Sequence, residues 1–174
     1  MRQLLPIFLF LGAVLATAQG PTPAAKPEDV KSIDSILAAL YNVISGPAGG
    51  KHDWDRFRSL FTIDGRLIGV GARGTNVRYR VVTPDEYVKL GGAYIEKNGF
   101  FEREIARRTD QFANIAHVFS TYESRNKADD KKPFERGINS IELFNDGARW
   151  WIVSIYYQGE DPKNPLPAKY LHNG

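Results

Sequence analysis

The sequence predicts an α+β protein of a single domain, in which three N-terminal helices pack in the concave face of a strongly bent, mostly antiparallel sheet. Two observations support this fold class. Residues 100–157 contain four long strand patterns, 100–112, 114–125, 134–144 and 149–157, with a charged loop between the second and the third. The residues before them show helical spacing, and helices followed by a run of strands are typical of α+β folds rather than of alternating β-α-β units.

The three predicted helices each have a recognisable start. The first begins at Pro27 and carries apolar residues at three- and four-residue spacing up to Ile44. The second follows Asp53, a suitable N-cap, and covers 54–61. The third begins with Thr83-Pro84-Asp85-Glu86, which combines an N-cap, a proline at the first helical position and a capping-box glutamate. We expect this helix to end at Asn98-Gly99.

The strand patterns divide their residues between two faces of the sheet. In 115–124, one face carries Ile115, His117, Phe119, Thr121 and Glu123, and the other carries Ala116, Val118, Ser120, Tyr122 and Ser124. Asn145-Asp146-Gly147 predicts a tight turn before the final strand, and 66–70 with 76–82 predict a small early hairpin. The final strand has large apolar residues on both faces, so we expect the helices to cover one face and a second copy of the chain, in a homodimer, to cover the other.

The first 18 residues have the pattern of a signal peptide. Arg2 supplies the positive charge, 4–15 is an apolar run too short to span a membrane, and Ala16-Thr17-Ala18 is a suitable cleavage site. We therefore expect a bacterial protein that is exported to the periplasm or secreted, with cleavage after Ala18. A disordered lead-in at 19–27, a folded domain at 28–158 and an extended tail at 159–174 would follow. The sequence has no cysteine, so packing alone must stabilise the fold, and no lipoprotein or other stable membrane anchor is expected.

Composition and motifs exclude several classes of function. The net charge is +3 and the basic residues are interspersed with acidic ones, so no nucleic-acid-binding stripe is expected. Three scattered histidines give none of the usual zinc spacings, and we expect no metal and no cofactor. Residues 69–74 match the dinucleotide-binding pattern GxGxxG, but a strand pattern follows where a helix is required, so we interpret them as a glycine-rich hairpin.

The order of elements, together with the stretches AHVFSTYES, RGINSIEL and DGARWWIVSIYY, resembles the nuclear-transport-factor-2-like superfamily over about residues 28–158. This superfamily includes ketosteroid isomerase and the SnoaL-like cyclases, and the stretches are similar to secreted bacterial members of unsettled function. The resemblance implies a cone-shaped fold, a pocket between the helices and the concave sheet, and dimerisation through the sheet. Members include enzymes, binding modules and oligomerisation domains, so function must come from the site.

Two residues are candidates for acid–base catalysis. His117 lies in a predicted central strand and would act as a general base if it faced the pocket, since the ordinary pKa of histidine is about 6.5. The alternative is a histidine hydrogen-bonded to a neighbouring strand. Glu104 shares one face of its strand with Glu102, which suits an acid–base pair if burial raises the pKa of one carboxyl group. Ion pairs with the nearby arginines are the other interpretation.

Five further residues are candidates for ligand binding. An arginine in the pocket would favour a carboxylate-bearing ligand, while tyrosine, asparagine and tryptophan combine apolar contact with a hydrogen bond. Each also has a purely structural alternative, such as an ion pair of the arginine at the sheet surface or a place in the core for the aromatic residues. The five candidates are Tyr122, Arg136, Asn139, Tyr41 and Trp54.

The preferred hypothesis is an exported domain that binds a small, largely apolar molecule with one polar end in this pocket. One alternative is isomerase, cyclase or dehydratase chemistry in the same pocket, with His117 or Glu104 as the acid or base. The second alternative is a non-catalytic, dimeric interaction module whose interior is filled by its own side chains.

Overall fold

A computed structural model describes residues 22–73 and 76–172, and its N-terminal part folds into α1 (Pro27–Val30), α2 (Ile33–Val43) and α3 (Trp54–Ser59). The first predicted helix is therefore two helices. The break occurs because the hydroxyl group of Ser32 accepts a hydrogen bond from the backbone nitrogen of Ser35 and so caps a new helix. Asp53 caps α3 as predicted, since its carboxylate accepts a hydrogen bond from the backbone nitrogen of Arg56.

The predicted signal peptide, 1–18, lies outside the described residues. Part of the predicted disordered lead-in is described, and there Ala25 packs against the core before Pro27 opens α1. Within the described residues, no helix is long and apolar enough to cross a membrane.

The third predicted helix is confirmed. Its capping box is complete: Thr83 accepts a hydrogen bond from the backbone nitrogen of Glu86, whose carboxylate accepts one from the backbone nitrogen of Thr83. The helix consists of α4 (Pro84–Tyr87), a π-helical turn (Val88–Gly92) and α5 (Ala93–Asn98), and it ends at Gly99, whose φ is 77°. A left-handed conformation at this position favours glycine.

In the described part of the chain, six strands form one sheet in the order β2-β1-β6-β5-β4-β3. Neighbouring strands are antiparallel except for β1 and β6, which are parallel. The four strands predicted for 100–157 are confirmed to within two residues at each end. β1 is longer than 66–70, the range predicted for the first strand of the early hairpin. The bounds are β1 (Phe61–Arg73), β2 (Asn76–Val82), β3 (Phe101–Phe112), β4 (Ile115–Arg125), β5 (Glu135–Asn145) and β6 (Trp150–Gly159).

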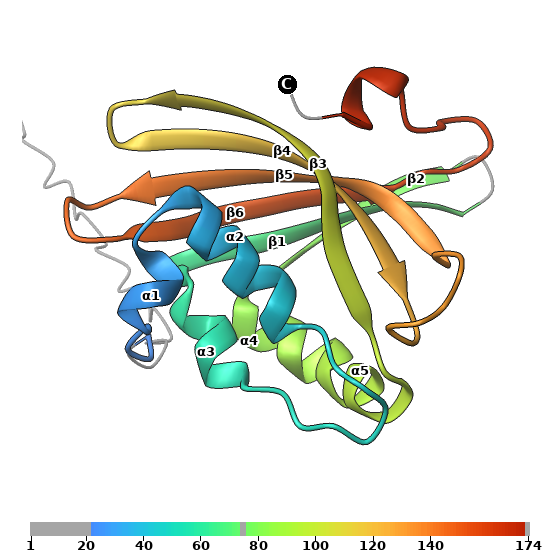
Figure 1. The fold of residues 1–174 in the computed structure, drawn as a ribbon, viewed down its shortest axis with the longest axis horizontal. Helices are drawn as coiled ribbons and strands as arrows, with labels where there is room; N and C mark the ends of the chain where they lie inside the picture. The colour runs from blue at the N-terminus through green and yellow to red at the C-terminus, as the bar shows by residue number, and fades with distance from the viewer. Residues whose placement is uncertain (1–21, 74–75, 173–174) are drawn as a thin grey trace, which may run out of the picture.

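The sheet bends over α1 to α5, which lie on its concave side (Figure 1). Even-numbered residues of β4 and odd-numbered residues of β5 point toward the helices, and Val118 and Ile141 are fully buried there in one core with Ile36 and Leu60. In β3 the register shifts between Glu104 and Ala106 at a bulge. The predicted architecture, a single α+β domain with helices in a concave and mostly antiparallel sheet, is thus confirmed.

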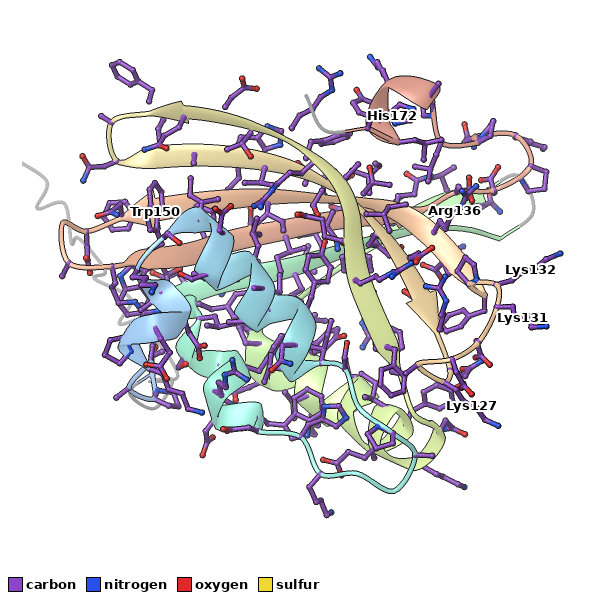
Figure 2. The ribbon with its side chains drawn as sticks, in the orientation of Figure 1. Lys127, Lys131, Lys132, Arg136, Trp150 and His172 are labelled. Atoms are coloured by element: carbon purple, nitrogen blue, oxygen red, sulfur yellow. The ribbon has the colours of Figure 1, made fainter. Side chains whose placement is uncertain are left out.

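The outer face of the sheet is only partly covered. The C-terminal segment folds back over it and ends in a short 3₁₀ helix, Ala168–Tyr170. There the carbonyl oxygen of Tyr170 accepts a hydrogen bond from Thr121, and its ring packs against Phe119 with 4.9 Å between ring centroids. Figure 2 shows His172 on this segment, while Lys127, Lys131 and Lys132 reach away from the sheet on the loop after β4. Apolar side chains remain exposed on β2 and β6, and the homodimer stays a prediction.

Candidate functional site

A cavity of about 150 Å³ lies between the helices and the concave face of the sheet. Its wall combines apolar side chains with a set of hydroxyl, carboxyl and amide groups that converge on one space. The apolar part includes Leu40, Ile44, Phe57, Leu67, Phe100, Phe134 and Ile155; the polar part is Tyr87, Glu102, Tyr122, Ser124, Glu135, Asn139 and Tyr157. Such convergence in an enclosed space is what a small-molecule site requires.

Glu102 is the central polar residue of this cavity. It lies on β3 opposite Ser124 of β4, whose hydroxyl donates to Glu102 Oε2 over 2.9 Å. The side-chain nitrogen of Asn139 donates to Glu102 Oε1 over 3.3 Å. Burial raises the pKa of Glu102 to about 7, because desolvation outweighs these two hydrogen bonds. Glu102 can therefore take up or release a proton near neutral pH.

A chain of hydrogen bonds connects Glu102 with Glu104. The side-chain nitrogen of Asn139 also donates to the hydroxyl oxygen of Tyr41 over 3.1 Å, and this hydroxyl lies 2.7 Å from Ser120 Oγ. Ser120 in turn donates to Glu104 Oε2. The amide nitrogen of Asn139 can only donate, so the hydroxyl of Tyr41 accepts from it and donates to Ser120, which in turn donates to Glu104. Burial raises the pKa of Tyr41, so its phenol stays protonated.

Two tyrosines line the end of the cavity at β5 and β6. The hydroxyl of Tyr122 donates to Glu135 Oε1 over 2.6 Å, and burial together with this hydrogen bond raises the pKa of Tyr122. Tyr157 faces the same space from β6, and burial raises its pKa as well. Both phenols are therefore neutral hydrogen-bonding groups at physiological pH.

Of the sequence-predicted residues, Tyr122 and Asn139 line the cavity. Tyr41 does not line it but belongs to the hydrogen-bonded chain through Asn139 and Ser120. Glu104 belongs to it through Ser120 but does not line the cavity. Its Oε1 lies 3.1 Å from the Nε of Arg107, as the ion-pair interpretation expected.

His117, Arg136 and Trp54 lie outside the cavity. Odd-numbered residues of β4 and even-numbered residues of β5 point away from the helices, so His117 is bonded on the outer face to Ser140 Oγ over 2.8 Å. Arg136, on the same face (Figure 2), pairs with Glu160 of the C-terminal segment over 2.6 Å instead of with a strand neighbour. The ring N–H of Trp54 donates a hydrogen bond to Glu96 Oε1 over 2.9 Å.

The sequence reasoning missed Glu135, Tyr157 and Tyr87, and treated Glu102 only as a companion of Glu104. Residue parity offered one signal that was not used: Glu135 shares the inner face of β5 with Asn139. Among residues 22–73 and 76–172, no group of three or more histidine, cysteine, aspartate or glutamate side chains is placed to hold a metal ion.

Neither a family model nor a curated protein matches the sequence, but solved structures do match the fold. A protein of unknown function with a cystatin-like fold from Nostoc punctiforme has a TM-score of 0.56 at 14% identity, over 78% of this chain and 92% of that one. A candidate scytalone dehydratase from Novosphingobium aromaticivorans has a TM-score of 0.53 at 12% identity, over 75% and 83%. A nuclear-transport-factor-2-like protein of unknown function from Shewanella baltica has a TM-score of 0.49 at 16% identity, over 74% and 91%.

At these identities the likeness concerns the fold alone. The resemblance predicted from the order of elements is confirmed at that level: the chain has the cystatin-like, nuclear-transport-factor-2-like α+β fold.

Proposed function

We propose that the cavity binds a small, largely apolar molecule through one polar group that faces Glu102. The observation that carries this proposal is the buried carboxyl group of Glu102, held by Ser124 and Asn139 in the wall of a cavity that combines apolar and polar side chains; burial raises its pKa to about 7. Each oxygen of Glu102 accepts one hydrogen bond from the protein and can take part in another, so a ligand group that pairs with this carboxyl group gains a strong hydrogen bond.

The size of the cavity limits the part of the ligand that it encloses. An engineered protein cavity of about 150 Å³ holds a benzene molecule, and the cavity described here has about the same volume. A single five- or six-membered ring therefore fits. Near neutral pH, protonated Glu102 donates to a carbonyl oxygen of the ligand, and ionised Glu102 accepts from a hydroxyl group.

A thermal-shift screen with small cyclic ketones, phenols and carboxylic acids tests this proposal. A ligand at about 100 times its dissociation constant stabilises the protein by about 2.7 kcal/mol. For a domain of this size, the midpoint moves by about 2–4 °C per kcal/mol. We expect the shift to be lost or to lose its pH dependence in Glu102→Gln, and to persist in His117→Ala, which changes only the outer face.

A flat response to the whole screen would contradict the proposal. It would favour the interaction module, in which the interior serves packing alone.

A second function, acid–base catalysis, is favoured by the presence of Glu102 and Tyr157 in the wall of the same cavity. A group with a pKa near the working pH is suited to proton transfer, and the neutral phenol of Tyr157 is suited to donate to an oxygen atom of a substrate that gains negative charge. Isomerisation or dehydration of a cyclic ketone or alcohol is the matching reaction class. Here Glu102 takes the role that the sequence suggested for His117 or Glu104.

This second function predicts turnover of a cyclic substrate found in the screen. The rate should depend on a group titrating near pH 7, and Glu102→Gln should lower it by about 10²–10⁴-fold. If the wild-type protein binds such a substrate but does not turn it over, the catalytic function is contradicted and the binding function stands.

A further inference from the structure

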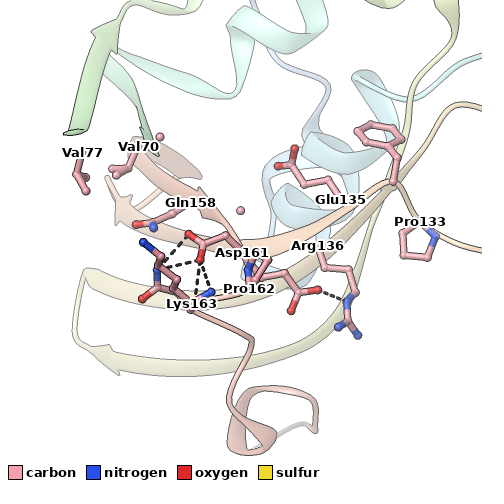
Figure 3. A pocket seen from close by; sticks show the side chains of 14 residues that line it. Val70, Val77, Pro133, Glu135, Arg136, Gln158, Asp161, Pro162 and Lys163 are labelled. Atoms are coloured by element: carbon pink, nitrogen blue, oxygen red, sulfur yellow. Dashed lines mark hydrogen bonds and ion pairs between the residues drawn. The ribbon is translucent and has the colours of Figure 1, made fainter. Parts of the chain in front are cut away.

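A groove of about 870 Å³ on the surface adjoins the cavity. It lies between the ends of β1, β2 and β6 and the segment that follows β6, and Figure 3 shows it with Val70 and Val77 on one side and Arg136 and Pro133 on the other. Phe134 and Glu135 line both spaces. Glu135 accepts a hydrogen bond from Tyr122, which lines the cavity, so the two spaces meet at Phe134 and Glu135.

The cavity is too small to enclose a typical ligand, whereas the groove is large enough to hold the rest of one. Pockets that bind small molecules usually measure about 300–1,000 Å³, and the cavity alone is well below that range while the groove lies within it. We propose that the ligand is a ring that carries an uncharged chain, with the ring in the cavity and the chain passing Phe134 and Glu135 into the groove. This inference rests on the proposed function of the cavity.

The chemistry of the groove favours an uncharged chain. Four of its charged side chains have partners. Glu135 accepts from Tyr122, Arg136 donates to Glu160 over 2.6 Å, and the carboxylate of Asp161 accepts from two backbone nitrogens that follow it. Satisfied charges of both signs leave little net attraction for a charged ligand group. Valine and proline side chains between them supply apolar contact for an alkyl or ether chain.

The position of Phe134 also favours a ligand chain that passes from the cavity into the groove. It stands at the junction of the two spaces with 53% of its surface exposed, and its ring lies 6.2 Å from that of Phe100, measured between centroids. A chain that leaves the cavity at this point would cover the exposed part of the ring, which is the favourable change expected on burial of apolar surface.

The affinities of phenol and of 4-alkylphenols with two to six chain carbons, measured by titration calorimetry at pH 7.5, test this inference. The wild-type protein should bind more tightly by about three- to fourfold for each added methylene that enters the groove. Gln158→Trp, at an exposed position in the groove, should bind phenol as the wild type does but gain nothing from the longer chains. Lys163→Trp, at another lining position of the groove, is a second blocking variant should the first fail to fold.

Val153→Trp is the matched control, because Val153 is an exposed residue of the same strand and does not line the groove. It should keep the full gain with chain length. Phenol binding without a gain in the wild type, or an equal gain in the blocked variants, would overturn the inference and leave the function of the cavity standing. Absence of binding for the whole series would overturn both.

Discussion

The hydroxyl oxygen of Tyr157 lies over Gly69, where a β-carbon on the glycine would come within 2.7 Å of it. The two residues are partners in the parallel pairing of β1 with β6. The tyrosine ring thus crosses the neighbouring strand at a position that only glycine leaves open. Gly69 is the first glycine of the stretch 69–74 that matches the dinucleotide-binding pattern, and its role here is to leave room for the ring of Tyr157.

Gly69→Ala should therefore displace the ring of Tyr157 from its place at the cavity. We expect a loss of about 1–3 kcal/mol in the free energy of unfolding, as for other insertions into packed sites, and weaker binding of any cavity ligand. Urea unfolding and calorimetry measure the two effects. Gly71→Ala is the control, since a β-carbon there meets nothing within 4 Å. Equal losses in both variants would show that the ring does not depend on Gly69.

The raised pKa of Glu102 predicts that stability falls as pH rises. The folded protein holds the proton of Glu102 up to about pH 7, whereas the unfolded chain releases it near about pH 4.3. The stabilisation is thus fully present below the unfolded pKa and is lost as pH rises through 7. At about 1.4 kcal/mol per pKa unit, the loss between pH 4 and pH 8 is about 3 kcal/mol.

Glu102→Gln should flatten this part of the pH profile and stabilise the protein at pH 8 relative to the wild type. Thermal midpoints at pH 5, 6, 7 and 8 provide the measurement. Burial also raises the pKa of Glu104, so Glu104→Gln is measured in parallel. A Glu102→Gln profile that runs parallel to the wild-type profile would assign the titration to another group.

The ion pair between Asp29 and Arg56 links α1 to α3. It is bidentate, with distances of 2.7 Å and 2.8 Å, and the side chain of Asp29 is only 8% exposed. Removing one partner of a buried pair leaves the other charge uncompensated, so Asp29→Ala should cost about 3 kcal/mol in urea unfolding. Asp55→Ala is the control, because Asp55 is 79% exposed and pairs only at the surface with Arg58. It should change stability by less than about 0.5 kcal/mol.

Asn139 should matter for the cavity, whereas His117 should not. The side-chain nitrogen of Asn139 donates to both Glu102 and Tyr41, and Asn139→Ala removes both hydrogen bonds. The free energy of unfolding should fall by about 1–3 kcal/mol, and the pKa of Glu102 should change. His117→Ala removes a hydrogen bond on the outer face and should leave ligand affinity unchanged. Affinity that falls only in His117→Ala would move the site to the outer face.

Local signals in the sequence were enough to predict most of the fold. The capping box at Thr83, the cap at Asp53 and the turn before the final strand each lie within a few residues, so they form largely independently of the rest of the chain. The break at Ser32 was missed because serine is also common inside helices, and here its neighbour Ser35 completes the cap.

The site was harder to predict because it depends on which face of each strand is buried. Strand alternation separates His117 from Tyr122 but does not say which set faces the helices. The register shift after Glu104 changes this assignment within β3, and the sequence around Ile105 carries no glycine or proline that would mark it. Tyr157 comes from a strand whose two faces are both apolar, so no pattern distinguished its inner face.

The parallel pairing of β1 with β6 also determines when the protein can fold during its synthesis. β6 lies between β1 and β5, so the hairpin of β1 and β2 has no neighbour in the sheet until β6 has left the ribosome. Pairing between such distant segments is slow because the long intervening chain must first be ordered. The sheet is therefore expected to be complete only once β6 has been synthesised, and loss of β6 should leave the early hairpin exposed to aggregation.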